Sequence, residues 1–175
     1  MHQENDPPTN SGANDLHMQL CKMTEEEAQA VSEWRYPAPY DVYRWPAWAD
    51  MLREGRELAD PDIRREQYLS VRDAEGVLVG YIQLFALDRA IRLGVGLRPD
   101  LCDRGLGKQL IQLAIQEATR RKPGAEIDLE VEHWNKRANR AYEKAGFVIT
   151  DYYSRRATHG IVNIYCMVWK PTKQA

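Results

Sequence analysis

Two glycines one residue apart, Gly105 and Gly107, come directly before a lysine and a run of apolar residues with helical spacing. The apolar residues of this run are Leu110, Ile111, Leu113, Ala114, Ile115 and Ala118. Because glycine has no Cβ, such a turn lets the backbone approach an anion, toward which the amides and dipole of the helix point. The segment is therefore either an anion-binding loop or a plain turn between a strand and a helix.

Two nucleotide-binding motifs also end in a glycine turn, and neither matches this chain. A Walker A loop requires Ser or Thr after the lysine and a glycine five residues before Gly107, where this sequence has Gln109 and Cys102. A dinucleotide fingerprint requires a third small residue at the position of Leu110. These mismatches argue against a kinase or another nucleotide-phosphate enzyme.

A second group of residues, further along the chain, has side chains suited to acid–base chemistry. Asn135 and Tyr142 are seven residues apart, which places them on one face of a helix, two turns from each other. Before them, Glu130 and Glu132 alternate with apolar residues of an expected strand. His133 is also a candidate, because the reference pKa of histidine, about 6.5, suits a base near neutral pH. The same residues are also consistent with a packed tyrosine and two solvent-facing glutamates.

Together the two groups make the run from Ile91 to Phe147 resemble the GNAT superfamily of N-acetyltransferases. The segment GLRPDLCDRGLG is similar to the family's strand followed by [QR]-x-x-G-x-[GA], although Cys102 stands where the family has Gln or Arg. The second family motif, N-x-x-A…Y-[EK]-[KR]-x-G-F, is matched by Asn135, Ala138, Tyr142, Glu143, Lys144, Gly146 and Phe147. The resemblance extends over nearly all of residues 18 to 170. It implies direct transfer of an acetyl group from acetyl-CoA to a primary amine.

The resemblance also implies roles for individual residues. Backbone groups around Gly96, Leu97 and Arg98 would hold the pantetheine arm of acetyl-CoA. The pyrophosphate would lie on the loop formed by Cys102, Asp103, Arg104, Gly105, Leu106, Gly107 and Lys108. Asn135 would bond to the pantetheine or cap its helix, and Tyr142 would contact the cofactor and act as general acid for the thiolate. No metal is implied.

The general base is open at this point. Many family members carry a glutamate on the strand before the loop, but AIRLGVGL has no carboxylate. Glu132, Glu130, His133 and a chain of water molecules are the alternatives. The missing carboxylate also leaves open a non-catalytic acyl-CoA sensor or regulatory module. The acceptor would lie between residues 35–66 and the terminal hairpin. The aromatic segment 34–48 could form a wall for it, which a protein N-terminus, a polyamine and an aminoglycoside would all fit.

The elements that must position these residues predict an α+β fold of one domain. We expect a mixed, mostly antiparallel sheet of about six to seven strands with about four helices. The expected strands are 18–23, QYLSVR, VLVGYIQLFAL, AIRLGVGL, IDLEVEH and a terminal hairpin. The expected helices start at Thr24, around Trp48, at Gly105 and at Asn135. Residues 1–17 are predicted to be a disordered tail, and 18–172 the acetyltransferase domain.

Composition and charge exclude several classes of protein. The hydrophobic content of 43% and charged content of 29% are typical of a globular domain, and the net charge of −2 gives no field for nucleic acid. No apolar run is long enough to span a membrane. Three widely spaced cysteines predict neither a disulfide framework nor a zinc site and suit a cytoplasmic protein. Either a monomer or a homodimer is consistent with the sequence.

Overall fold

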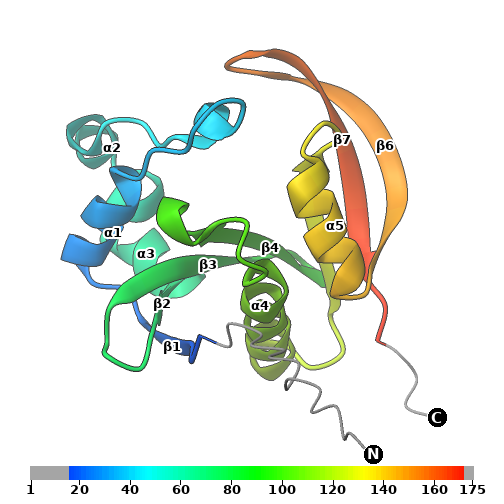
Figure 1. Ribbon diagram of the computed structural model, residues 1–175, viewed down its shortest axis with the longest axis horizontal. Helices are drawn as coiled ribbons and strands as arrows, with labels where there is room; N and C mark the ends of the chain where they lie inside the picture. Colours follow the sequence, from blue (N-terminus) through cyan, green and yellow to red (C-terminus); the bar gives the residue numbers. More distant parts are fainter. Residues whose placement is uncertain (1–15, 172–175) are drawn as a thin grey trace, which may run out of the picture.

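The computed structural model describes residues 16–171, which form a seven-stranded sheet and five α-helices (Figure 1). The strand order is β1-β2-β3-β4-β5-β7-β6, and every neighbouring pair is antiparallel except β4 and β5. The expected mixed, mostly antiparallel sheet is thus confirmed. Within residues 16–171, no helix is long and apolar enough to cross a membrane. Most of the predicted tail, 1–15, and residue 172 lie outside the described residues.

The first part of the chain forms one strand and a cluster of short helices. Its elements are β1 (Gln19–Lys22), α1 (Glu25–Ser32), the 3-10 turn η1 (Tyr40–Tyr43), α2 (Trp48–Glu54), the 3-10 turn η2 (Glu57–Ala59) and α3 (Pro61–Gln67). The capping box predicted at Thr24 is present, since Thr24 and Glu27 each accept the other's backbone N–H. Helix α3 was not expected from the sequence, so five helices replace the four predicted.

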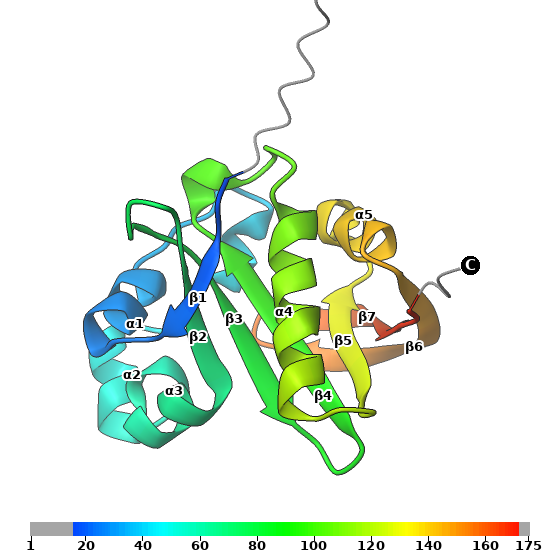
Figure 2. The ribbon, with the colours of Figure 1, turned by 90° about the horizontal axis from the view of Figure 1, so that it is seen from below.

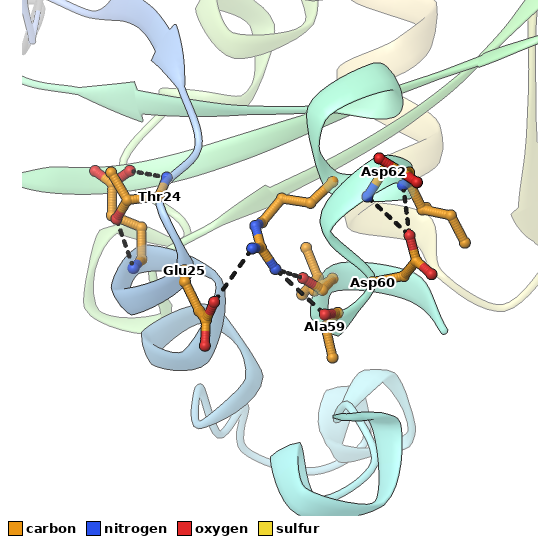
Figure 3. Close-up of polar contacts among 9 residues, drawn as sticks. Thr24, Glu25, Ala59, Asp60 and Asp62 are labelled. Atoms are coloured by element: carbon orange, nitrogen blue, oxygen red, sulfur yellow. Dashed lines mark hydrogen bonds and ion pairs between the residues drawn. The ribbon is translucent and has the colours of Figure 1, made fainter. Parts of the chain in front are cut away.

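Caps and one arginine hold this helical cluster together (Figure 3). Asp60 caps α3 by accepting the N–H groups of Asp62 and Ile63, and Pro61 occupies the first position of the helix. The guanidinium of Arg64, 8% exposed, donates to the Leu58 carbonyl at 2.7 Å and lies 3.4 Å from a Glu25 oxygen. These contacts join α1, η2 and α3 into one unit beside the sheet.

The remaining elements form most of the sheet and its two long covering helices. They are β2 (Tyr68–Arg72), β3 (Leu78–Ala86), β4 (Ala90–Leu97), the 3-10 turn η3 (Pro99–Leu101), α4 (Gly107–Arg121), β5 (Glu126–Glu132), α5 (Lys136–Lys144), β6 (Phe147–Ala157) and β7 (Gly160–Trp169). Each of these strands and helices was expected, with boundaries that differ by a few residues.

Alternation along the strands divides the interior into two apolar clusters on opposite faces of the sheet. One face packs Ile82, Leu93 and Leu129 against α4 and α5, with Leu110 and Phe147 in the same cluster. On the other face, Tyr68 and Tyr81 pack with residues of the α1 to α3 region. Figure 2 shows α4 crossing the middle of the sheet, while α1, α2 and α3 gather at its β1–β2 end. The second face is thus covered by helices only beside β2 and β3.

Candidate active site

The sheet opens between its two central strands. The parallel strands β4 and β5 pair only from Ala90 to Arg92, opposite Glu126 to Asp128. Strand β4 continues to Leu97 along β3, and the Arg98 N–H still donates to the Val79 carbonyl. Since hydrogen-bonded and non-hydrogen-bonded residues alternate in an antiparallel pair, alternate residues of β4 direct their N–H and C=O away from β3 into the opening. These residues are Leu93, Val95 and Leu97.

A cleft of about 1030 Å³ extends from this opening. It is lined by β4 from Leu93 to Leu97, by much of the loop 102–108, by the first residues of α5 and by the aromatic segment before β2. One carbonyl of β4 in the opening is already paired, since the Tyr36 hydroxyl donates to Leu97 at 2.7 Å. The cleft thus combines free backbone groups with the glycine loop that was identified in the sequence.

The glycine loop has the backbone expected of an anion-binding turn. Gly105 has φ of +79°, a conformation that L side chains rarely adopt. Helix α4 begins at Gly107, and no side chain caps its first amides. Unpaired N–H groups and the positive end of the helix dipole therefore lie at the cleft. Cys102, Asp103, Gly105, Leu106, Gly107 and Lys108 all line it.

Two of the residues predicted to contact the cofactor are not among those that line the cleft. The Arg98 guanidinium pairs with Asp100 at 2.6 Å and donates to the Leu78 carbonyl, so it lies on the other side of the strand end. Arg104 is exposed beside the loop. Asp103, which would repel an anion, is instead paired with Arg137 of α5 at 3.0 Å. Burial raises the pKa of the Cys102 thiol, which keeps it protonated and argues against a nucleophile.

Tyr142 lies in the cleft, as the sequence predicts. Its ring packs edge-on against Phe147, with centroids 5.9 Å apart. The hydroxyl has no hydrogen-bond partner within residues 16–171, and burial raises the pKa of Tyr142. Asn135 also lines the cleft: its Oδ1 accepts the Ala138 N–H and caps α5, and its Nδ2 donates to the Tyr43 hydroxyl at 3.1 Å.

The carboxylates of β5 point away from α4, and they have different partners. Asp128 and Glu130 share Arg92, and Glu130 is also 3.3 Å from Arg155. Glu132 lines the cleft at 9% side-chain exposure and, within residues 16–171, forms no ion pair with Lys or Arg. Its carboxylate accepts the Trp134 indole N–H and lies 3.2 Å from Nε2 of His159. Glu132 is therefore the cleft carboxylate whose negative charge is not balanced by a permanent cation.

His133, the other predicted base, is placed elsewhere. Its ring contacts Tyr165 and Tyr152 edge-on, at centroid distances of 5.1 and 6.0 Å, and it is not among the residues that line the cleft. Strand alternation explains this position, because His133 follows Val131 onto the face that packs against α5. The structure thus brings Tyr142 and Glu132 into the cleft without His133.

The aromatic segment serves two purposes. Tyr36, Tyr40, Tyr43 and Trp45 line the cleft, whereas Trp34 and Trp48 pack in the second apolar cluster. Tyr40 and Tyr43 lie against Trp134 at 5.7 and 5.8 Å, and the Arg137 guanidinium lies 3.7 Å over the Tyr40 ring. Burial raises the pKa of Tyr43 to about 12. The segment is therefore both a wall of the cleft and part of the packing.

Two residues of this site were not found by sequence reasoning. Trp134 follows Glu132 by two positions, but only the structure shows that its indole donates to that carboxylate. His159 is 27 residues away in the turn between β6 and β7, and no local pattern connects it with β5. This contact forms only because the folded hairpin brings His159 back to β5.

Comparisons with known proteins agree with this geometry. The acetyltransferase (GNAT) family matches residues 26–147. Among solved structures, a chimera of the spermidine N-acetyltransferase SpeG from Vibrio cholerae and hSSAT superposes with a TM-score of 0.71 at 18% identity, over 87% of this chain and 95% of that chain. A GNAT family acetyltransferase from Bacillus anthracis gives 0.69 at 16% identity, over 87% and 93%. No curated protein sequence matches. At these identities the solved structures establish the fold.

Proposed function

This chain belongs to the GNAT family of acetyltransferases, and from that premise we propose that an acetyl group passes from acetyl-CoA to a small primary amine beside Glu132. The observation that carries the proposal is the placement of Glu132 and Tyr142 in one cleft, next to the opening between β4 and β5. The opening supplies a site for an extended donor, and the two side chains supply a proton acceptor and a proton donor.

The residues present fit acetyl-CoA, which would supply an activated acetyl thioester. The amides of the loop 105–108 and the start of α4 would hold the pyrophosphate, with Lys108 adding a positive charge. Backbone groups of Val95 and Leu97 in the opening would hold the pantetheine arm in strand-like fashion. A β4 amide directed at the carbonyl that gains negative charge would stabilise it as an oxyanion hole does.

Proton transfers are assigned to the two ionisable side chains. An amine attacks only when it is neutral, so the ammonium form must first lose a proton, and Glu132 is placed to accept it. Arg92 already pairs with Asp128 and Glu130, whereas Glu132 has no Lys or Arg partner within residues 16–171 and is therefore open to the ammonium group of an acceptor. Tyr142 remains protonated because burial raises its pKa, so its hydroxyl is able to donate a proton to the leaving thiolate.

The acceptor side of the cleft favours a small amine with an aliphatic or aromatic body. Tyr43 and Trp45 provide flat apolar surfaces, and Glu132 provides the negative charge that an ammonium group seeks. Structural neighbours of this chain include spermidine N-acetyltransferases, which makes a polyamine one natural member of a first panel. Aminoglycosides and peptide N-termini complete it.

The first test is thermal unfolding with and without acetyl-CoA, with ATP and NAD as controls. A ligand at 100 times its Kd adds about 2.7 kcal/mol of stability, which a melting curve resolves. The amine panel is then followed by release of the CoA thiol. Glu132→Gln should lower the rate about a hundredfold. The matched control, Glu126→Gln, changes an exposed residue at the far end of the same strand and should have no effect. A melting shift with ATP alone, or equal rates for the two variants, would contradict the proposal.

A further inference from the structure

The strands of the β6–β7 hairpin are longer than β5, the strand through which the hairpin joins the sheet. The last residue of β5, Glu132, pairs with Ile164, and the hairpin continues for several residue pairs to its turn at Thr158 and His159. Figure 1 shows the β6–β7 hairpin as a long arch that curves past α5. The arch would be an extended two-stranded ribbon without further support. Two side chains of the arch, Arg155 and His159, contact carboxylates of β5.

These two contacts fall on successive outward carboxylates of β5. Arg155 of β6 lies 3.3 Å from Glu130, and His159 at the turn lies 3.2 Å from Glu132. The first contact joins a permanent cation to a carboxylate that already has Arg92. The second brings an imidazole to the one carboxylate of the cleft that has no Lys or Arg partner within residues 16–171. The arch thus contacts the proposed base, Glu132, through a histidine, whereas it contacts Glu130 through an arginine.

We propose that His159 is a positioning residue that fixes the Glu132 carboxylate for proton transfer from the acceptor amine. The inference rests on the proposed function, in which Glu132 is the base. His159 does not line the cleft, so it acts on the reaction through Glu132. Through the His159 side chain alone, the β6–β7 hairpin then contributes to the active site, although it is far from the acetyl-CoA loop in the sequence.

The geometry around Glu132 explains why a histidine suits this position. The Trp134 indole donates to the carboxylate from one side, and Nε2 of His159 lies 3.2 and 3.3 Å from its two oxygens. Trp134 is itself held by Tyr40 and Tyr43, with Tyr43 stacked at an interplanar angle of 18°. Contacts from two sides fix the orientation of the carboxylate, and no guanidinium competes with the acceptor ammonium for it.

The carboxylates further along β5 give the contrast. Asp128 and Glu130 face Arg92, and Glu130 also faces Arg155, so these four residues carry two charges of each sign. At Glu132 the hairpin contact comes from an imidazole instead, so no arginine occupies that carboxylate. The Arg155 contact with Glu130 therefore holds the hairpin on β5, while the His159 contact positions the Glu132 carboxylate.

A double-mutant cycle tests the inference. His159→Ala should lower kcat about tenfold, since a hydrogen bond to a charged group is worth on the order of a factor of ten or more. The KM for acetyl-CoA should stay unchanged. His159→Gln, which keeps an N–H donor, should recover most of the rate. In the Glu132→Gln background, His159→Ala should have no further effect, because His159 acts through Glu132. A matched control is Thr158→Ala in the same turn, which should leave kcat unchanged.

A spectroscopic measurement tests the same contact without turnover. The chain has five tryptophans, and Trp134→Phe identifies the Trp134 indole N–H resonance. That resonance should move in His159→Ala and remain in place in Thr158→Ala. An unmoved resonance, or a loss of kcat that persists undiminished in the Glu132→Gln background, would overturn the inference. If the wild-type protein acetylates no amine, the proposed function fails. If it does so and His159→Ala is as active as wild type, only the role of His159 fails.

Discussion

Gly96 offers a sharp test of how the cleft is built. A Cβ at this position would lie 2.3 Å from Cε1 and 2.8 Å from Cζ of Tyr81. Ordinary van der Waals contact begins near 3.4 Å, so the ring would have to retreat by about 1 Å. Trp34 and Trp45, each 6.1 Å away between ring centroids, and Tyr68, 6.3 Å away, oppose that movement. We therefore expect Gly96→Ala to be destabilising.

Overpacking of this kind costs about 2 kcal/mol, which corresponds to a fall in Tm of roughly 4–8 °C for a domain of this size. Differential scanning calorimetry measures it. Gly107→Ala is the control, because a Cβ there meets only the Ala141 methyl at 3.5 Å and φ is not positive. Tyr81→Leu should largely remove the penalty of Gly96→Ala when the two changes are combined. A Tm of Gly96→Ala equal to that of wild type would refute the reasoning.

Three further predictions concern single side chains. Tyr142→Phe should lower kcat by about ten- to a hundredfold at an unchanged acetyl-CoA melting shift, measured by thiol release; an equal rate would remove Tyr142 from the chemistry. Asn135→Ala removes the cap of α5 and should cost about 1 kcal/mol, seen as a fall in Tm of roughly 2–4 °C. Arg120, and then Arg121, lowers the pKa of Glu117 to about 2, so the stability that Glu117 contributes is complete above its ordinary pKa of 4.5 and lost as pH falls toward 2. Glu117→Gln should therefore lower Tm at pH 7, and the difference from wild type should shrink in the acid range.

Much of the fold could be predicted from local patterns. Thr24 and Glu27 define the start of α1 because their capping box is a contact over three residues. Alternation of Ile127, Leu129 and Val131 identifies β5, because one face of that strand is buried. Helix α3 was missed although Asp60 and Pro61 form a clear N-terminal signal. The helix has only seven residues, too few for its apolar period to stand out from the charged residues around it.

The part of the site that would hold the acetyl donor, acetyl-CoA, was also predictable, because it consists of a short loop and the helix that follows it. Gly105 is needed by the backbone itself, because its φ of +79° is rare for L side chains, so this turn remains readable in one sequence. The directions of the side chains were harder to predict. Arg98 and Arg104 belong to the segment 96–108 that was expected to bind the cofactor, but they do not line the cleft. Whether an exposed arginine turns toward a ligand or toward Asp100 depends on neighbours that sequence position alone does not give.

The acceptor side shows why a base is harder to predict than a cofactor loop. Glu130 and Glu132 have the same residue type, the same strand and the same face, and nothing local distinguishes them. The difference comes mainly from partners far along the chain, since Glu130 faces Arg92 and Arg155, whereas Glu132 faces His159. Trp134 is only two residues from Glu132, but its position in the sequence does not reveal that its indole N–H donates to that carboxylate. Two arginines already occupy Glu130, whereas Glu132 has no Lys or Arg partner within the described residues and is open to an acceptor ammonium. The candidate base is thus distinguished by contacts between elements: Arg92 of β4 and Arg155 of the hairpin reach Glu130, and His159 of the hairpin reaches Glu132.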